Sequence, residues 1–438
     1  MQNCQRTVGI LTLGCKVNQY ESEAIAERMA AEGFLVRPHT ERCDVYILNT
    51  CTVTSESDRK ARQMIRRLVK QNPNAYVLVT GCFAQVAPEQ IAAIDGVDFI
   101  CGNADKLSVV QAALDLVRSG RKNDSAQLSV VPPDTYGFEP MCIERFDRTR
   151  AYIKIEDGCE SRCAYCIIPK ARGHIRSKSP TDVISEVSKL TLGGCREVVL
   201  TGIETASYGK DLDGVDLADL LCRVDRIPNI GRVRLGSLDP SLIKAGFVER
   251  IRSLRSLAPH FHLSMQSGSD SVLARMRRKY NTKIALEGIR LLREQLPNVQ
   301  FTTDMIVGFP GETEEEFAQT LDFIEQVGFL MIHVFPYSRR RGTKADQMKD
   351  QIPEEIKHQR VQILSDRQSA IRKRILESEI GKTAEVLFET FQDGLAIGHT
   401  DSFIEVKCPS AEPLHACLLP VRITGTDGIT CTGEILNV

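Results

Sequence analysis

The amino-acid sequence predicts an α/β protein made of an N-terminal doubly wound parallel sheet, a central partial (β/α)6 barrel and a C-terminal small β-barrel. Two regions in which buried strands alternate with helices predict the first two parts. A final stretch of short strands broken by Gly, Asp and Pro predicts the third. We expect an N-terminal domain over 1–119, a linker over 120–150, a central domain over 151–376 and a β-barrel over 377–438.

The composition is that of a globular protein, with 438 residues of which 42% are hydrophobic and 26% are charged. No apolar run approaches the ~20 residues of a transmembrane helix, and the start lacks a basic stretch followed by an apolar one. We therefore expect a cytoplasmic protein with no membrane partner. In a reducing compartment, metal binding or catalysis explains the fifteen cysteines better than disulfides do.

Three strands of the N-terminal part are each followed closely by a cysteine. The predicted strands are 8–13, 45–48, 76–79 and 97–100, and the predicted helices are 18–32, 55–71 and 105–118. Cys15, Cys51 and Cys82 follow the first three strands and should converge, because the carboxyl ends of parallel strands share one edge. Cys101, after the fourth strand, is the main competitor, and Cys43 lies at the opposite edge. The pattern indicates a three-thiolate metal site.

A second group of cysteines lies on one short loop after a predicted strand at 151–155. Cys159, Cys163 and Cys166 have three residues between the first pair and two between the second. A tetrahedral zinc site would need a fourth ligand, and the sequence offers none nearby. Three thiolates can hold a [4Fe–4S] cube and leave one iron free for a small molecule. The alternative is three buried structural cysteines.

The central part repeats the strand–helix pattern six times. After 151–155, the further predicted strands are 197–200, 232–235, 261–264, 299–307 and 330–334. Six units match a partial barrel, whose active face should lie at the carboxyl ends of the strands. Residues just past the strand ends are candidate ligand contacts: Thr201, Gly202, Glu204, Ser237, Asp239, Gln266, Ser267, Pro336, Tyr337 and Arg339.

Histidines and arginines of the central part give two further predictions. His262 and His333 lie on apolar strands, so we expect packed, hydrogen-bonded side chains rather than acid–base groups. Arginines that follow the last strand should bind a phosphate backbone: Arg339, Arg340 and Arg341.

The last part is expected to form five strands, at 383–389, 395–399, 403–407, 418–424 and 431–436. A small closed barrel of this kind is typical of oligonucleotide binding. From residue 377 onward, however, three basic residues stand against ten acidic ones, a net charge of −7. Because backbone affinity comes mainly from Lys and Arg, we expect most phosphate contacts in the central part.

The cluster loop resembles that of the radical S-adenosylmethionine (SAM) enzymes, in which the free iron binds SAM. Three further motifs resemble the N-terminal domain of the methylthiotransferases within that group: Thr12-Leu-Gly-Cys-Lys-Val-Asn-Gln-Tyr-Glu-Ser22, Asn49-Thr-Cys-Thr-Val53 and Thr80-Gly-Cys-Phe-Ala-Gln85. The resemblance implies two [4Fe–4S] clusters, one on each cysteine triad, and SAM as cofactor. It also implies SAM contacts at the second-strand turn, with Gly202 and Glu204, and near the ribose, with Gln266; Ser237 is a further candidate.

Gly14-Cys-Lys-Val-Asn-Gln-Tyr20 and Cys166-Ile-Ile-Pro-Lys-Ala-Arg-Gly173 look most like the branch acting on N6-threonylcarbamoyladenosine of tRNA. That branch inserts sulfur and transfers a methyl group at C2 of this base, next to the anticodon. The implied partners are tRNA and a flavodoxin- or ferredoxin-like electron donor. Branches acting on isopentenyladenosine or on a ribosomal-protein aspartate are alternatives. So are an iron–sulfur electron carrier and a non-catalytic iron–sulfur or zinc RNA-binding protein.

Overall fold

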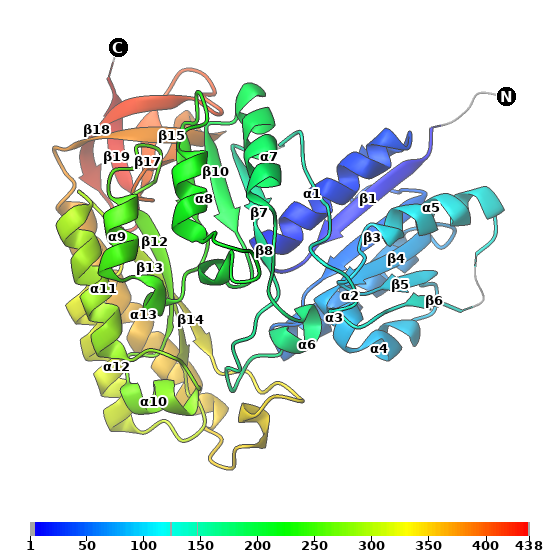
Figure 1. Ribbon diagram of the computed structural model, residues 1–438, viewed down its shortest axis with the longest axis horizontal. Coiled ribbons are helices and arrows are strands. Elements are labelled where there is room, and N and C mark those ends of the chain that lie inside the picture. The colour runs from blue at the N-terminus through cyan, green and yellow to red at the C-terminus, as the bar shows by residue number, and fades with distance from the viewer. Residues whose placement is uncertain (1–4, 123–124, 147, 437–438) are drawn as a thin grey trace.

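A computed structural model of the chain describes residues 5–122, 125–146 and 148–436. Its N-terminal part is a six-stranded parallel sheet, seen at the right of Figure 1. The strands are β1 (Thr7–Thr12), β2 (Leu35–Arg37), β3 (Val45–Thr50), β4 (Tyr76–Gly81), β5 (Phe99–Cys101) and β6 (Gln127–Ser129). The helices are α1 (Lys16–Ala31), α2 (Ser55–Gln71), α3 (Cys82–Val86), α4 (Pro88–Ala92) and α5 (Ser108–Ser119).

This sheet is doubly wound, as predicted. The strand order is β2-β1-β3-β4-β5-β6, so the direction of winding reverses between β1 and β3. Apolar side chains of α1 and α5 pack on one face, and those of α2, α3 and α4 pack on the other. In open α/β sheets, ligands bind at the carboxyl edge where the winding reverses. The first two triad cysteines follow the two strands at that point.

The segment expected to be a linker, residues 120–150, also makes contacts with the folded parts on either side of it. Residues 127–129 form the edge strand β6, which pairs with β5. Farther along, Met141 and Ile143 are buried in the core of the central part, and the Tyr20 hydroxyl donates to the Met141 carbonyl over 2.6 Å. The prolines and polar residues of this stretch predicted a loop, but contacts with distant elements determine where it lies.

The central part contains six parallel strands in two half-sheets. Their orders are β11-β10-β7 and β12-β13-β14, and the parallel bridges Val233–Leu257 and Leu238–Leu263 join them. The strands are β7 (Arg150–Lys154), β10 (Glu197–Thr201), β11 (Arg232–Leu235), β12 (His260–Gln266), β13 (Gln300–Val307) and β14 (Met331–Pro336). The helices that follow them are α7 (Pro180–Leu192), α8 (Leu217–Val224), α9 (Ala245–Ile251), α11 (Thr282–Gln295), α12 (Glu314–Val327) and α13 (Glu354–Glu377). This alternation is the predicted partial (β/α)6 barrel.

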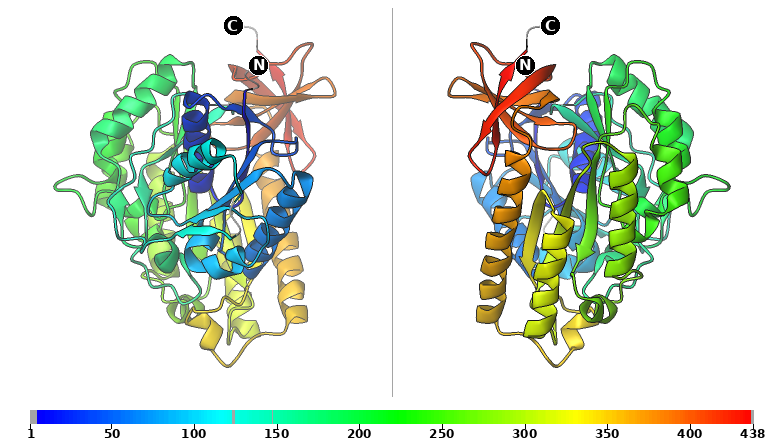
Figure 2. Two further views of the ribbon diagram at one scale, coloured as in Figure 1. Left: turned by 90° about the vertical axis from the view of Figure 1, so that its right-hand side faces the viewer. Right: turned by 90° about the vertical axis from the view of Figure 1, so that its left-hand side faces the viewer.

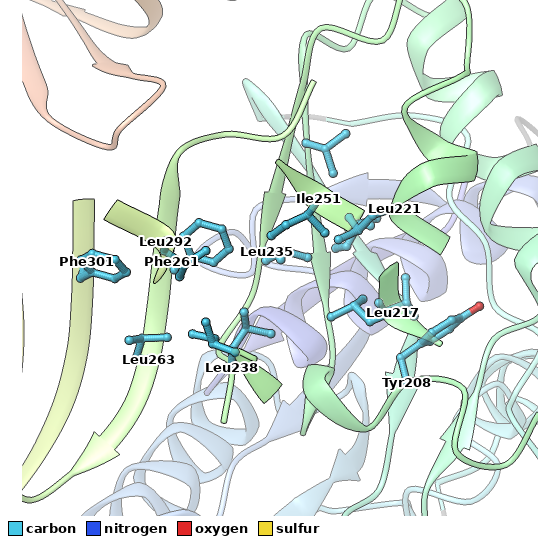
Figure 3. Close-up of a cluster of buried hydrophobic side chains, with 14 of the residues drawn as sticks. Tyr208, Leu217, Leu221, Leu235, Leu238, Ile251, Phe261, Leu263, Leu292 and Phe301 are labelled. Carbon is cyan, nitrogen blue, oxygen red and sulfur yellow. The ribbon is translucent and has the colours of Figure 1, made fainter. Parts of the chain in front are cut away.

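One hydrophobic core lies between the strands and helices of the partial barrel. Figure 3 shows Leu235, Phe261 and Phe301 from three successive strands meeting leucines and isoleucines of the covering helices. Because side chains alternate along a strand, the neighbouring positions face away from this core. In the second half-sheet α11, α12 and α13 lie side by side on the outer face (Figure 2), so those neighbouring positions point inward.

The C-terminal part is a closed five-stranded barrel in the order β15-β16-β17-β19-β18, as predicted. The strands are β15 (Thr383–Gln392), β16 (Leu395–Thr400), β17 (Glu405–Pro409), β18 (Leu418–Thr426) and β19 (Cys431–Ile435). The barrel is joined to the partial barrel by aromatic and ionic contacts. Phe403 stacks on His260 and His399, and the guanidinium groups of Arg150 and Arg234 lie over its ring.

Helix α13 connects the last strand of the partial barrel to the small β-barrel. It has 24 residues, long enough to cross a bilayer, but charged side chains occur throughout its length. Within 5–122, 125–146 and 148–436, no helix is both long and apolar enough to span a membrane.

Candidate functional site: two cysteine triads and the surface between them

The first triad lies at the carboxyl edge of the N-terminal sheet. Cys15 precedes α1, Cys51 follows β3, and Cys82 begins α3. Gly14 allows this approach, because its φ is +106° and a Cβ added there would lie 2.8 Å from the Cβ of Cys51. The competitor Cys101 is fully buried in the core beneath α5.

The thiols of this triad are close enough to oppose one another's ionisation. Burial, together with the thiols of Cys82 and Cys15, raises the pKa of Cys51 to about 11. The pKa of Cys15 is also raised, chiefly by burial, and Cys82 again contributes. Cys15 and Cys51 therefore become thiolates readily only when a bound cation offsets their charge.

The second triad lies on the loop between β8 (Glu156–Asp157) and α6 (Ile168–Arg172). The Cys159 amide donates to the Gly173 carbonyl over 2.9 Å, which closes the loop. Burial, together with the neighbouring Cys163 thiol, raises the pKa of Cys159 to about 11 and that of Cys166 to about 12. The thiols of this loop are therefore close enough to interact electrostatically, as those of the first triad are.

Each triad supplies three thiols. No three His, Cys, Asp or Glu side chains of the described residues are placed to hold one metal ion. A zinc site gathers four ligands around one atom, whereas each cysteine of a [4Fe–4S] site binds a different iron.

Arg172 connects the two triads and was not predicted. Its Nε donates to the Cys82 sulfur over 3.3 Å, and its Nη1 donates to Asp157, at the start of the second loop, over 2.9 Å. Nη1 also donates to Glu21 of α1 over 2.9 Å. Helix α6, which ends at Arg172, packs against α3, which begins at Cys82 (Figure 1). The two triads thus lie on neighbouring elements.

A buried ionic network surrounds this contact. Lys106 and Lys154 also pair with Glu21, and Lys154 pairs with Asp157 over 2.7 Å. All five side chains are at most 4% exposed. Burial alone would raise the pKa of Glu21, but Arg172, Lys106 and Lys154 hold it well below its usual value. Three cations against two carboxylates leave one positive charge beside Cys82, which favours an anionic group there.

The predicted phosphate-binding arginines differ in their surroundings. Arg340 is only 7% exposed, and its guanidinium pairs with Asp58 and donates to Thr52, the residue after Cys51. Its assignment to phosphate is therefore wrong, because a side chain pairing two domains is unavailable to a ligand. Arg339, with a side chain 63% exposed, and Arg341 remain accessible.

A cavity of about 200 Å³ lies beside the second triad. Most of its lining residues are polar or charged, and they come from the cluster loop, from the segments after β10 and β11, and from Lys279: Ser161, Glu204, Ala206, Ser207, Lys210, Asp239, Ser241, Leu242 and Lys279. Burial, together with the neighbouring Asp239 carboxylate, raises the pKa of Glu204 to about 7. Carboxylates and lysines together can hold both charged groups of an amino acid.

None of the other predicted SAM contacts lines this cavity. A Cβ added to Gly202 would lie 2.5 Å from a carboxylate oxygen of Glu156, which also accepts the Glu204 amide over 2.8 Å. Gly202 therefore shapes the turn that presents Glu204. Ser237 is exposed, and Gln266 ends β12 with a φ of +65°; neither lines the cavity. Lys210 and Lys279 do line it, although neither was predicted to contact a ligand.

The inward-pointing side chains of the second half-sheet form a surface that the sequence did not predict. We call His262, Asp304, His333 and Phe335 the inner face. His262 lies 3.3 Å from Asp304, and its ring centroid is 6.2 Å from that of His333. His262 is hydrogen-bonded to Thr302 as predicted, but the expectation of a packed His333 is wrong, because this residue is exposed.

Lys16 reaches toward the inner face from the N-terminal part. Its side chain is accessible to solvent, yet protein surrounds it closely enough for burial to lower its pKa. Arg234 and Arg150 lower that pKa further, whereas Asp304 and Glu197 raise it. A side chain that projects between two folded parts can be accessible to solvent and still be surrounded by protein. Lys16, the residue directly after Cys15, thus places a cation near Asp304.

Comparisons with known proteins agree with this geometry. A model of the Radical SAM superfamily matches residues 153–324, and a model described as Uncharacterized protein family UPF0004 matches residues 7–102. Threonylcarbamoyladenosine tRNA methylthiotransferase MtaB of Bacillus subtilis is 40% identical, with 95% of this chain and 93% of that protein covered. The tRNA-2-methylthio-N(6)-dimethylallyladenosine synthase of Carboxydothermus hydrogenoformans is 36% identical, with 96% and 97% covered.

Solved structures support the fold alone. The radical SAM methyltransferase TsrM from Kitasatospora setae, bound to cobalamin and a [4Fe–4S] cluster, is similar with a TM-score of 0.53 at 17% identity. That similarity covers 76% of this chain and 75% of TsrM. With near-full-length relatives at up to 40% identity and both characteristic domains present, the chain belongs to the radical SAM tRNA methylthiotransferases.

Proposed function

We propose that the protein methylthiolates C2 of N6-threonylcarbamoyladenosine next to the anticodon of tRNA, using two [4Fe–4S] clusters and SAM. The observation that carries this proposal is the placement of two cysteine triads on neighbouring elements, with Arg172 touching both sides. A single triad would support radical chemistry alone. A second one at the reversal point of the N-terminal sheet supports a sulfur-carrying site beside it.

The residues suited to each cofactor follow from the described geometry. Cys159, Cys163 and Cys166 would hold one cluster, and Cys15, Cys51 and Cys82 would hold the other. Glu204 and Asp239 suit the ammonium group of SAM, while Lys210 and Lys279 suit its carboxylate. When bound, these groups supply one-electron chemistry together with the sulfur and the methyl group of the product.

We propose threonylcarbamoyladenosine as the substrate base because the relatives named for this base include those at 40% and 38% identity. In this proposal the protein works in the cytoplasm and takes electrons from a flavodoxin- or ferredoxin-like protein. We also retain the division into 1–119, 120–150, 151–376 and 377–438, and the two family matches, at 7–102 and 153–324, fall within its first and third segments.

Mass spectrometry of tRNA nucleosides tests the substrate directly. Cells lacking the gene should lose 2-methylthio-N6-threonylcarbamoyladenosine and accumulate its precursor, and the wild-type gene should restore the product. Loss of the isopentenyl counterpart would assign the protein to the other tRNA branch. An unchanged nucleoside profile would contradict a tRNA substrate.

Iron analysis tests the two-cluster site. The anaerobically reconstituted protein should hold about eight irons per chain, since each [4Fe–4S] site has four. Replacing Cys159, Cys163 and Cys166 by Ala should remove about half of that iron. Zinc in place of iron would contradict the proposal. Formation of 5′-deoxyadenosine by the reduced protein would exclude a simple electron carrier.

A further inference from the structure

Lys16 has no anionic partner of its own. In the described ranges 5–122, 125–146 and 148–436 it forms no ion pair within 4.0 Å. The charged groups that interact with it electrostatically are Arg234, Arg150, Asp304 and Glu197. Glu197 is already bound by Arg150 and Arg234, over 2.8 and 2.9 Å. Asp304 already pairs with His262 of the inner face. The surroundings of Lys16 therefore favour an additional anion.

The inner face opposite Lys16 is accessible and is suited to a flat ligand. Phe335 is 47% exposed, and the Asp304 side chain is 30% exposed. Helices cover the other side of this half-sheet, so these side chains do not belong to the hydrophobic core. Exposed aromatic rings in nucleic-acid enzymes commonly stack on a base.

The spacing of these groups matches a base that carries an extended acidic substituent. Phe335 and His333 lie on the same face of β14, two residues and therefore about 7 Å apart. A base stacked on Phe335 can extend a substituent several bonds long past His333 toward Lys16. The threonylcarbamoyl group has that length and ends in a carboxylate, whereas unmodified adenosine has neither.

We propose that Lys16 binds the carboxylate of the N6-threonylcarbamoyl group and thereby selects the hypermodified base. This assignment rests on the proposed function and deepens it, because it names the residue that recognises the substituent. Lys16 follows Cys15 directly, so recognition of the substituent takes place next to the first triad. Phe335 supplies stacking that does not depend on the substituent.

Equilibrium binding of three RNAs to the full-length, anaerobically reconstituted protein tests this proposal. The anticodon stem-loops are identical except for one base, which is threonylcarbamoyladenosine, its methyl ester or adenosine. Because their phosphates are the same, affinity differences report on the substituent alone. The wild type should bind the acid ~10-fold more tightly than the ester, as expected for a close charge pair. Lys16→Met should bind the two within about twofold of each other.

Three further variants identify the cause of any change. Lys16→Arg keeps the charge and should keep the preference for the acid. Phe335→Ala should weaken binding of all three RNAs alike, since stacking does not read the carboxylate. Lys283→Met, at an exposed site on α11, should behave as the wild type does. Iron content is measured for each variant, so that a lost preference with full iron content is not due to a lost cluster.

The two proposals fail in different ways. If the wild type prefers the acid and Lys16→Met keeps that preference, Lys16 does not bind the carboxylate, and the proposed substrate stands. If Lys16→Arg loses the preference as fully as Lys16→Met does, the effect does not come from charge and the assignment is wrong. If the wild type binds all three RNAs equally and cells lacking the gene keep their 2-methylthio product, both proposals are wrong.

Discussion

Arg172 is fully buried, and its guanidinium group contacts four other residues: Asn18, Glu21, Cys82 and Asp157. Replacing it by Met would leave Glu21 and Asp157 with Lys106, Lys154 and the partly buried Arg176 as their cationic partners. Breaking a buried ionic network in this way typically costs about 3–5 kcal/mol. Arg172→Met should therefore lower the urea midpoint of the apo-protein without changing the slope of the transition.

An exposed arginine provides the control for this experiment. Arg290→Met removes a pair with Glu294 in which both side chains are about half exposed, and it should change stability little. Equal midpoints for Arg172→Met and Arg290→Met would show that the network does not stabilise the contact between the two triads.

Gly14 should be needed for the first triad in particular. Its positive φ and the 2.8 Å approach to the Cys51 Cβ leave no room for a side chain. Gly14→Ala should therefore displace Cys51 and remove about four of eight irons, while the second triad keeps its own. Gly33→Ala is the matched control, because its φ is +87° but no atom lies within 4 Å of the added Cβ. Full iron content in Gly14→Ala would contradict this role.

The site residues that a local sequence pattern reveals were predictable. Those whose position depends on contacts with residues far away in the sequence were not. The six cysteines were identified because strand ends and close spacing are visible in the sequence. Arg172 contacts Cys82 and Glu21 across 90 and 151 residues, and Arg340 contacts Asp58 across 282. No short-range pattern distinguishes these arginines from those on a solvated surface.

Strand β10 joins the partial barrel to the C-terminal barrel through Glu197. This carboxylate is fully buried and pairs with Arg150, Arg232 and Arg234. Two of these arginines also donate to backbone carbonyls of the C-terminal barrel, between residues 385 and 401. Burial alone would raise the pKa of Glu197, but the arginines lower it from 4.5 to about 2.

The lowered pKa of Glu197 predicts a specific loss of stability in acid. A carboxyl group whose pKa is lower in the folded state than in the unfolded state stabilises the protein fully at pH values above its unfolded-state pKa. This stabilisation is lost as the pH falls to its folded-state pKa. The contribution is worth about 3 kcal/mol and should disappear between about pH 5 and pH 2. Glu197→Gln should be less stable than the wild type at pH 7, and the difference should narrow across this range in urea titrations. A stability difference between Glu197→Gln and the wild type that stays constant across this pH range would contradict the lowered pKa of Glu197.

Elements with strong periodicity were predicted well, and those defined by their neighbours were not. Helix α2 was recognised from apolar side chains three and four positions apart, and its bounds agree with the prediction. The strands of both barrels were also identified. Strand β6 is three exposed residues long, and only its pairing with β5 makes it a strand. The contacts that residues 127–143 make with distant elements likewise leave no local pattern in the sequence.

At the scale of the whole molecule, the proposed function requires the two triads and the inner face to act as a single working surface. The first triad and Lys16 come from the N-terminal part, while the second triad and the inner face come from the partial barrel. The C-terminal barrel covers the opposite ends of the strands, where Phe403 stacks on His260. This division leaves the carboxyl ends of the strands for the substrate, as in complete barrels.

The charge distribution predicts where the tRNA backbone is bound. The C-terminal barrel has a net charge of −7 from residue 377 onward, whereas Arg339 and Arg341 are accessible just past β14. Replacing both by Glu should weaken tRNA binding by roughly tenfold or more and reduce its salt dependence, because fewer counterions are released. Arg422→Glu makes the same charge change at one residue of the C-terminal barrel. It should weaken tRNA binding much less. If Arg422→Glu weakens binding more than the double reversal does, the barrel is the main phosphate-binding part despite its charge.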